Sequence, residues 1–246
     1  MSGVKDEVPT RPLPRPCHRD CLAFCHSQER PTTTRDGVLP ESAWAQLWKD
    51  GATRIDEFAD IAVLGAARDE VLASLTGDTA SPGPEALRWD VPTPHRWRDD
   101  RVVWIEKRHL EGRSALQGLQ RQILILREEL SAELRMKGAT ESQIAVYHPG
   151  ATGYARHLDA DPADGTEGWP DQGTGDRRVT AILYLNTSWE AEHGGCLRLW
   201  KASGDKEDVV PGGASLLLFL SGCIEHQVLP LGPGSPPRVA LTTWFY

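Results

Sequence analysis

The sequence has few of the features that mark a membrane protein or a nucleic-acid-binding protein. Its 246 residues contain no stretch of 18 consecutive apolar residues, so no membrane span is expected. Acidic residues outnumber basic ones by 35 to 27, and the net charge is −8. The densest basic cluster, at 96–101, is interrupted by two aspartates. Because phosphate binding requires clustered lysine and arginine, nucleic acid is not expected as a partner.

A secretory signal is also lacking, and the cysteine count is odd. No apolar run follows the first residues, so we expect an intracellular protein, in the cytoplasm or also in the nucleus. Five cysteines without a signal favour reduced thiols. Cys17, Cys21 and Cys25 lie close to His18 and His26, which are enough ligands for zinc. Because the cluster has no Cys-x-x-Cys pair, we favour cysteines that do not bind a metal, and a zinc site remains an open alternative.

The chain divides into two regions by composition. Residues 1–38 combine five prolines with many charges, which predicts a flexible tail that contains the clustered cysteines. Residues 39–246 are long enough for one large domain with a core of its own. Helical spacing of apolar residues predicts a short helix capped by Ser42, and longer helices at 58–75 and 114–136.

Short β-segments separated by turns dominate the rest of the chain. Besides strand-like stretches at 51–55 and 102–105, eight segments follow, at 142–148, 153–159, 178–186, 195–200, 208–211, 215–220, 225–230 and 237–245. This pattern is typical of a jelly roll, a double-stranded β-helix. We therefore predict an α+β protein in which N-terminal helices support a β-helix core.

Two histidines and an aspartate suggest a metal site. His157 and Asp159 are two positions apart, so on a strand their side chains point to the same face. His226 follows 69 positions after His157 and can complete the set from another strand. Two imidazoles and one carboxylate on one face form the triad of non-haem Fe(II) oxygenases, which leaves the opposite coordination sites open.

A single arginine follows these residues on the last predicted strand. Alternation places Arg238, Ala240, Thr242 and Trp244 on one face. If that face is buried, the guanidinium needs an anion, and its planar fork matches a carboxylate. A dicarboxylate such as 2-oxoglutarate could then chelate the iron with one end and pair with Arg238 at the other, with Tyr184 adding a hydrogen bond.

Four ordered motifs resemble one known family. The segments 147–159, 178–186, 194–199 and 238–244 are similar to corresponding segments of the hypoxia-inducible-factor prolyl hydroxylases, within the prolyl-4-hydroxylase-like 2-oxoglutarate oxygenases. The resemblance covers residues 100–246 well and 40–100 faintly. It implies that Fe(II), 2-oxoglutarate and O2 are used, and it is compatible with ascorbate as a further cofactor.

The resemblance also implies a role for each residue at a matching position. His157, Asp159 and His226 would ligate iron, while Arg238 would hold the distal carboxylate of 2-oxoglutarate. Three further residues would line the site: Tyr147 in the co-substrate pocket, Trp244 beside the iron, and Tyr154 near the substrate entrance.

The implied activity is 4-hydroxylation of a prolyl residue in a protein or peptide, with succinate and CO2 as co-products and a role in oxygen sensing. Two alternatives remain open. One is a hydroxylase of another residue or of a small molecule. The other is an iron- and 2-oxoglutarate-binding sensor module with little turnover. The segment 160–176, which differs from the corresponding loop of the family, leaves the target protein open.

Overall fold

The computed structural model describes residues 38–75, 87, 89, 97–134, 136, 140–160, 177–201 and 203–246. The predicted tail lies outside these residues except for Val38, and so does the segment 161–176. Within the described part of the chain, no helix is both long and apolar enough to cross a bilayer.

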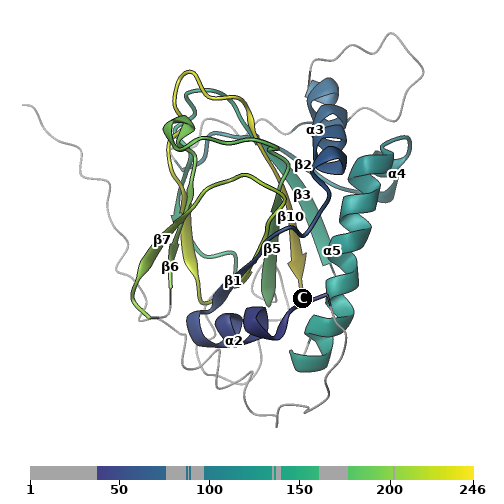
Figure 1. Cartoon of the computed structure of the whole chain (residues 1–246). Helices are drawn as coiled ribbons and strands as arrows, with labels where there is room; N and C mark the ends of the chain where they lie inside the picture. The colour runs from purple at the N-terminus through teal and green to yellow at the C-terminus, as the bar shows by residue number, and fades with distance from the viewer. Residues whose placement is uncertain are drawn as a thin grey trace, which may run out of the picture.

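In the described part of the chain, ten strands form two antiparallel sheets that face each other (Figure 1). The larger sheet, called the major sheet here, has the order β1-β8-β5-β10-β3-β2. Its strands are β1 (Ala52–Ile55), β2 (Arg101–Trp104), β3 (Thr140–Tyr147), β5 (Val179–Tyr184), β8 (Leu216–Leu220) and β10 (Arg238–Phe245). The smaller, minor sheet has the order β4-β9-β6-β7. Its strands are β4 (Tyr154–His157), β6 (Leu197–Trp200), β7 (Lys206–Val209) and β9 (Glu225–Val228). The predicted double-stranded β-helix core is confirmed, and each predicted strand is present.

Helices cover the outer face of the major sheet. They are α3 (Ile61–Leu75), α4 (Lys107–Leu110) and α5 (Ser114–Glu133). Helix α2 (Glu41–Asp50) lies at the lower end, and a 3-10 turn, η2, spans Ala191–His193. The longest, α5, buries its apolar stripe completely, because these residues recur every three or four positions: Leu116, Leu119, Ile123, Leu126 and Leu130. Helix α3 packs beside α5 on the same side of the sheet (Figure 1).

Three predicted helix boundaries are wrong, and local chemistry explains one of them. Pro40, not Ser42, occupies the N-cap of α2, and no side chain caps that end. Helix α3 begins at Ile61 and not at residue 58, because Asp60 Oδ1 accepts the amide hydrogens of Ala62 and Val63 at 2.7 and 3.2 Å. Ile61 itself is 48% exposed and does not belong to the buried face. Helix α5 ends at Glu133, three residues earlier than predicted.

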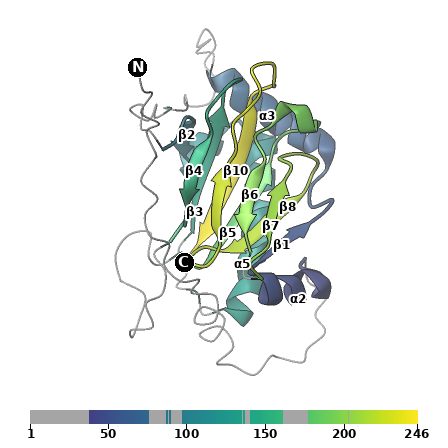
Figure 2. The ribbon, with the colours of Figure 1, turned by 90° about the vertical axis from the view of Figure 1, so that its left-hand side faces the viewer.

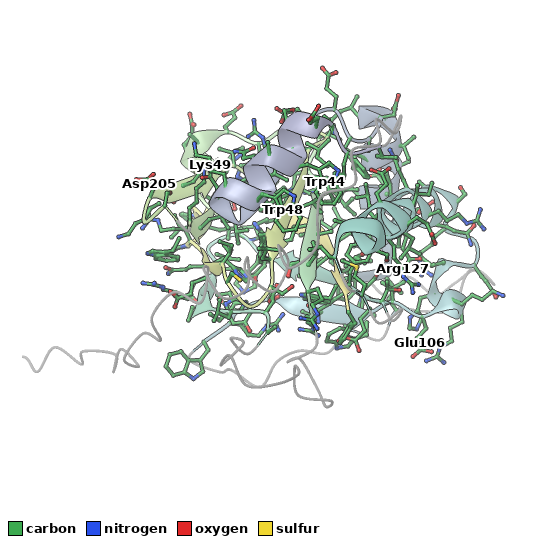
Figure 3. All side chains as sticks on the ribbon, turned by 90° about the horizontal axis from the view of Figure 1, so that it is seen from below. Trp44, Trp48, Lys49, Glu106, Arg127 and Asp205 are labelled. Carbon is green, nitrogen blue, oxygen red and sulfur yellow. The ribbon has the colours of Figure 1, made fainter. Side chains whose placement is uncertain are left out.

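Helix α2 covers the lower end of the β-helix, as Figure 3 shows from below. Trp44 and Trp48, both labelled there, stack at 6.2 Å between ring centroids and pack against the core under the helices. Gly51 ends α2 in the left-handed conformation, at φ +75°, and its amide donates to the Leu47 carbonyl. The chain then continues directly into β1.

Two separate apolar clusters form on the two faces of the major sheet. One lies between this sheet and the helices, and the other lies between the two sheets. Strand β10 contributes to both, since Val239 and Leu241 belong to the first cluster and Ala240 to the second. The predicted alternation along this strand is therefore correct, and it turns Arg238 and Trp244 toward the space between the sheets.

Candidate metal and co-substrate site

A cavity of about 200 Å³ lies between the two sheets. Seven of the eight residues predicted for the site line it: Tyr147, Tyr154, His157, Asp159, His226, Arg238 and Trp244. The eighth, Tyr184, is fully buried behind Arg238, whose guanidinium carbon lies 5.1 Å from the centre of the Tyr184 ring. The structure thus brings all the predicted residues together in one place.

Strand pairing in the minor sheet places the two histidines side by side. His157 on β4 is directly opposite His226 on β9, and their ring centroids are 4.2 Å apart. This close pairing begins at Gly153, where φ is +90° and an added Cβ would lie 2.2 Å from the Val228 carbonyl oxygen. Asp159 follows β4, and its Oδ1 lies 3.6 Å from Nε2 of each histidine. One ligand atom from each of the three residues lies within 4.8 Å of the others.

Backbone carbonyls orient both imidazoles. Nδ1 of His157 is 2.7 Å from the Ala155 oxygen, and Nδ1 of His226 is 3.2 Å from the Ile224 oxygen. A neutral imidazole that donates from Nδ1 presents the lone pair of Nε2 to the cavity, as a metal ligand must. Burial, and then the proximity of His157, lower the pKa of His226 to about 4, so His226 is neutral at physiological pH.

The Asp159 carboxylate is held by hydrogen bonds from the major sheet. Its Oδ2 accepts from Thr180 Oγ1 at 2.8 Å and from Trp244 Nε1 at 3.0 Å. Burial opposes ionisation of this group, but the adjacent histidines and the Trp244 hydrogen bond outweigh burial and lower its pKa below the usual value. Asp159 is therefore an ionised carboxylate whose Oδ1 faces the two imidazoles.

Arg238 lies at the other end of the cavity lining and is only 2% exposed. Its Nε donates to the Gly195 carbonyl oxygen at 2.8 Å, and its guanidinium lies over the Tyr147 ring at 5.3 Å. Gly195 has φ of +67°, and an added Cβ would lie 3.3 Å from Arg238 Cδ. Among the described residues, no carboxylate forms an ion pair with Arg238, although a buried guanidinium needs an anion.

The Tyr184 hydroxyl beside this guanidinium is buried and has no hydrogen-bond partner among the described residues. Burial raises the pKa of Tyr184 to about 12, against the opposing effect of Arg238, so the phenol keeps its proton. A carboxylate placed against Arg238 would satisfy both groups. The triad fits Fe(II), and the arginine and phenol fit the distal carboxylate of 2-oxoglutarate, so the residues present match both groups.

The structure also shows cavity residues that the sequence reasoning missed. Arg98 and Asp100 form a two-point ion pair, with N–O distances of 2.6 and 2.7 Å, and both line the cavity. Arg98 lies outside the predicted strands, but it forms an isolated β-bridge with Tyr154, the first residue of β4. The Tyr154 ring stacks on His157 at 3.8 Å between ring centroids, and the Arg98 guanidinium lies 4.7 Å from the centre of the Tyr154 ring. An Arg-x-Asp spacing in extended backbone was the only available signal.

Arg177 was missed as well. It lines the cavity, lies over the Trp244 ring at 4.1 Å and donates to Glu141 at 3.0 Å. On the rim, Trp104 is 41% exposed and packs against Trp244 at 5.5 Å. The entrance is therefore formed by aromatic rings with cations beside them.

Comparisons with known proteins agree with this geometry. Residues 142–246 match the family described as the 2OG-Fe(II) oxygenase superfamily. Egl nine homolog 1 of Rattus norvegicus is 32% identical over 155 residues, which is 61% of this chain and 41% of that protein. The chain therefore spans less than half the length of this curated relative.

Two solved structures are similar over most of the chain. A prolyl-4-hydroxylase of Pseudomonas putida has a TM-score of 0.60 and 28% identity, covering 83% of this chain and 96% of its own. A prolyl hydroxylase of Trichoplax adhaerens, solved with a hypoxia-inducible-factor peptide, has a TM-score of 0.64 at 24% identity. It covers 84% of this chain and 88% of its own. At 24% identity, the likeness to the Trichoplax adhaerens structure supports the fold alone.

Proposed function

We propose that this chain, whose residues 142–246 form a domain of the 2OG-Fe(II) oxygenase superfamily, hydroxylates a prolyl residue of a protein or peptide at the 4-position, with succinate and CO2 as co-products. The domain uses Fe(II), 2-oxoglutarate and O2. The observation that carries the proposal is a single cavity that contains both a His-Asp-His triad and a buried arginine without an anionic partner among the described residues.

Each group in the cavity has a defined task in this reaction. His157, Asp159 and His226 would hold Fe(II) on one face and leave its remaining sites open toward the cavity. When bound, Fe(II) couples the oxidative decarboxylation of 2-oxoglutarate by O2 to insertion of one oxygen atom into a substrate C–H bond. Arg238 would pair with the distal carboxylate of 2-oxoglutarate, and the protonated Tyr184 hydroxyl would donate to the same carboxylate.

The closed geometry supports the same assignment. His226 is buried, the Asp159 side chain is only 9% exposed, and apolar side chains such as Ile182 and Val228 line the same cavity. Such a lining excludes water and strengthens the charge pairing of a bound dicarboxylate.

The choice of a prolyl substrate rests on the named relatives and on the entrance. The likeness to the Pseudomonas putida prolyl-4-hydroxylase extends over 96% of that protein at 28% identity, which supports the same class of reaction. The rings of Tyr154, Trp104 and Trp244 at the cavity suit a small, largely apolar ring such as that of proline.

Turnover of 2-oxoglutarate with matched peptides tests this proposal. Purified protein with Fe(II), 2-oxoglutarate and ascorbate is given proline-containing peptides and the same peptides with alanine in place of proline. We expect succinate release to rise only with the proline series, together with a mass increase of one oxygen atom on proline. Stimulation by a free small molecule, or oxidation of another residue, would replace the prolyl assignment. Iron and 2-oxoglutarate binding without any turnover would indicate a sensor module instead.

A further inference from the structure

A pair of buried hydroxyl groups lies behind the carboxylate of the triad. Thr180 Oγ1, which donates to Asp159 Oδ2, is also 2.9 Å from Ser221 Oγ. Both side chains are completely buried, at 0% exposure. We propose that Thr180, supported by Ser221, is a positioning residue that makes Asp159 a one-oxygen ligand; this rests on the proposed function, because it concerns the same metal.

The direction of these hydrogen bonds follows from the chemistry of each group. An ionised carboxylate only accepts, and an indole N–H only donates. The Thr180 hydroxyl has one hydrogen, which it gives to Asp159 Oδ2. It must then accept from Ser221, so the order is Ser221 to Thr180 to Asp159. Because the pair is buried, water does not readily replace either hydroxyl.

Two donors on Oδ2 decide which oxygen meets the metal. Thr180 and Trp244 are cross-strand partners on β5 and β10, and they reach the same oxygen from neighbouring strands. Oδ2 is thereby occupied, whereas Oδ1 remains directed toward the two imidazoles. A carboxylate that binds through one oxygen leaves more of the metal surface for co-substrate and O2 than one that chelates.

The same hydroxyl pair connects the two sheets. Asp159 follows a strand of the minor sheet, but its amide donates to the Ser221 carbonyl oxygen at 3.2 Å. Ser221 follows β8 of the major sheet and donates its own amide to the Arg178 carbonyl at 3.0 Å. Asp159 is thus fixed to the major sheet by its backbone through Ser221 and by its side chain through Thr180.

The chain provides a matched control for this interaction. Thr243 on β10 is also 0% exposed, and its hydroxyl pairs with Ser142 Oγ at 2.9 Å. Neither residue lines the cavity. Replacing Thr180 or Thr243 with valine removes one buried hydroxyl from the major sheet and keeps the side-chain shape. Of the two threonines, only Thr180 contacts Asp159.

The experiment is a titration with Mn(II), a redox-stable substitute for Fe(II), monitored by the electron-paramagnetic-resonance signal of free Mn(II). We expect Thr180→Val to weaken Mn(II) binding by about 10- to 100-fold, the range found when a hydrogen-bond partner of a ligand is removed. Thr180→Ser keeps the donor and should restore binding. Thr243→Val should lower the Tm to a similar degree but bind Mn(II) like the wild type. The Mn(II) affinity of Ser221→Ala should lie between those of Thr180→Val and Thr243→Val, because Thr180 can still donate to Asp159.

Three outcomes would contradict the positioning role of Thr180. If folded Thr180→Val binds Mn(II) as the wild type does, the positioning role is wrong while the proposed function stands. If the wild-type chain does not bind Mn(II), the proposed function fails and this inference fails with it. If Thr180→Val does not fold, Ser221→Ala carries the test, and wild-type affinity in that variant would overturn the proposal.

Discussion

The major and minor sheets differ in how they meet solvent. Every residue of β5, β8 and β10 is buried, because helices cover one face and the minor sheet covers the other. The minor sheet alternates instead, as in the pattern of buried and partly exposed residues along β6 and β9. Among the described residues, no helix covers its outer face (Figure 2), which carries surface ion pairs such as Arg198–Asp208, at 2.7 Å.

This difference divides the site into two halves. The minor sheet supplies the two histidines from adjacent strands. The major sheet supplies Arg238 and Tyr184, which we propose bind the co-substrate, together with the donors that hold Asp159. The charged and polar anchors thus come from the sheet that is buried on both faces, where such groups interact more strongly than they would near water. The following predictions test that division, from the largest expected effect to the smallest.

Loss of the triad carboxylate should have the largest effect. Asp159→Ala removes the anionic ligand between the two imidazoles, and we expect 2-oxoglutarate turnover to fall below detection. Succinate formation measures it. Asp208→Ala, on the outer face of the minor sheet, is the control and should leave the rate unchanged. Wild-type turnover in Asp159→Ala would exclude the triad as the metal site.

Truncating a side chain should cost more unfolding free energy in the major sheet than in the minor sheet. Leu241→Ala, on the helix-facing side of β10 and 0% exposed, should cost about 2–5 kcal/mol in the free energy of unfolding. Gln227→Ala, on the partly exposed side of β9, should change it by less than about 0.5 kcal/mol. Urea denaturation measures both. Equal losses would mean that the sheets do not differ as described.

Removing Arg238, the residue proposed to bind 2-oxoglutarate, should have the next largest effect. Arg238→Ala leaves the distal carboxylate of 2-oxoglutarate without its charge partner in a buried site. We expect the apparent KM for 2-oxoglutarate to rise about 100-fold, equivalent to about 2.7 kcal/mol. Arg198→Ala, exposed on the minor sheet, is the matched control. An unchanged KM in Arg238→Ala would assign the co-substrate to another residue.

The stability of the metal-free protein should depend on pH through His226. Its pKa in the folded protein is about 4, below the usual 6.5, so between these values the unfolded chain binds a proton that the folded protein does not. Stability is therefore full above about pH 6.5 and is lost as the pH falls toward 4. Urea midpoints across this range measure it. His226→Gln should flatten the slope, and an equal slope in that variant would place the titrating group elsewhere.

The smallest effect is expected at the phenol beside the arginine. Tyr184→Phe removes one hydrogen bond to the co-substrate but keeps the ring under Arg238. We expect the apparent KM for 2-oxoglutarate to rise by about 3- to 10-fold, equivalent to about 0.5–1.5 kcal/mol. A loss as large as that of Arg238→Ala would mean that the phenol does more than donate one bond.

Local patterns were sufficient to predict much of this arrangement. The helical spacing in α5 and the alternation along β10 each depend on a period that the sequence displays, and both are correct. The His157 and Asp159 pair was predicted from two-residue spacing on one strand. Strand β4 ends at His157 and Asp159 follows it, but the two side chains still meet, with 3.6 Å between Nε2 and Oδ1.

What the sequence could not indicate depends on contacts between distant segments. The pairing of Thr180 with Ser221, 41 positions apart, follows only once β5 and β8 are known to be neighbours. The Arg98–Asp100 pair lies in a segment with no regular pattern, and its place is set by pairing with Tyr154. The division of strands between the two sheets is likewise a property of the whole fold.

The most direct test of the account is a crystal structure of the chain with Mn(II) and 2-oxoglutarate, with anomalous scattering used to locate the metal. We predict one metal peak within bonding distance of Nε2 of His157 and His226 and of Oδ1 of Asp159, with a carboxylate of 2-oxoglutarate against Arg238. A metal bound elsewhere, or 2-oxoglutarate that does not contact Arg238, would contradict it.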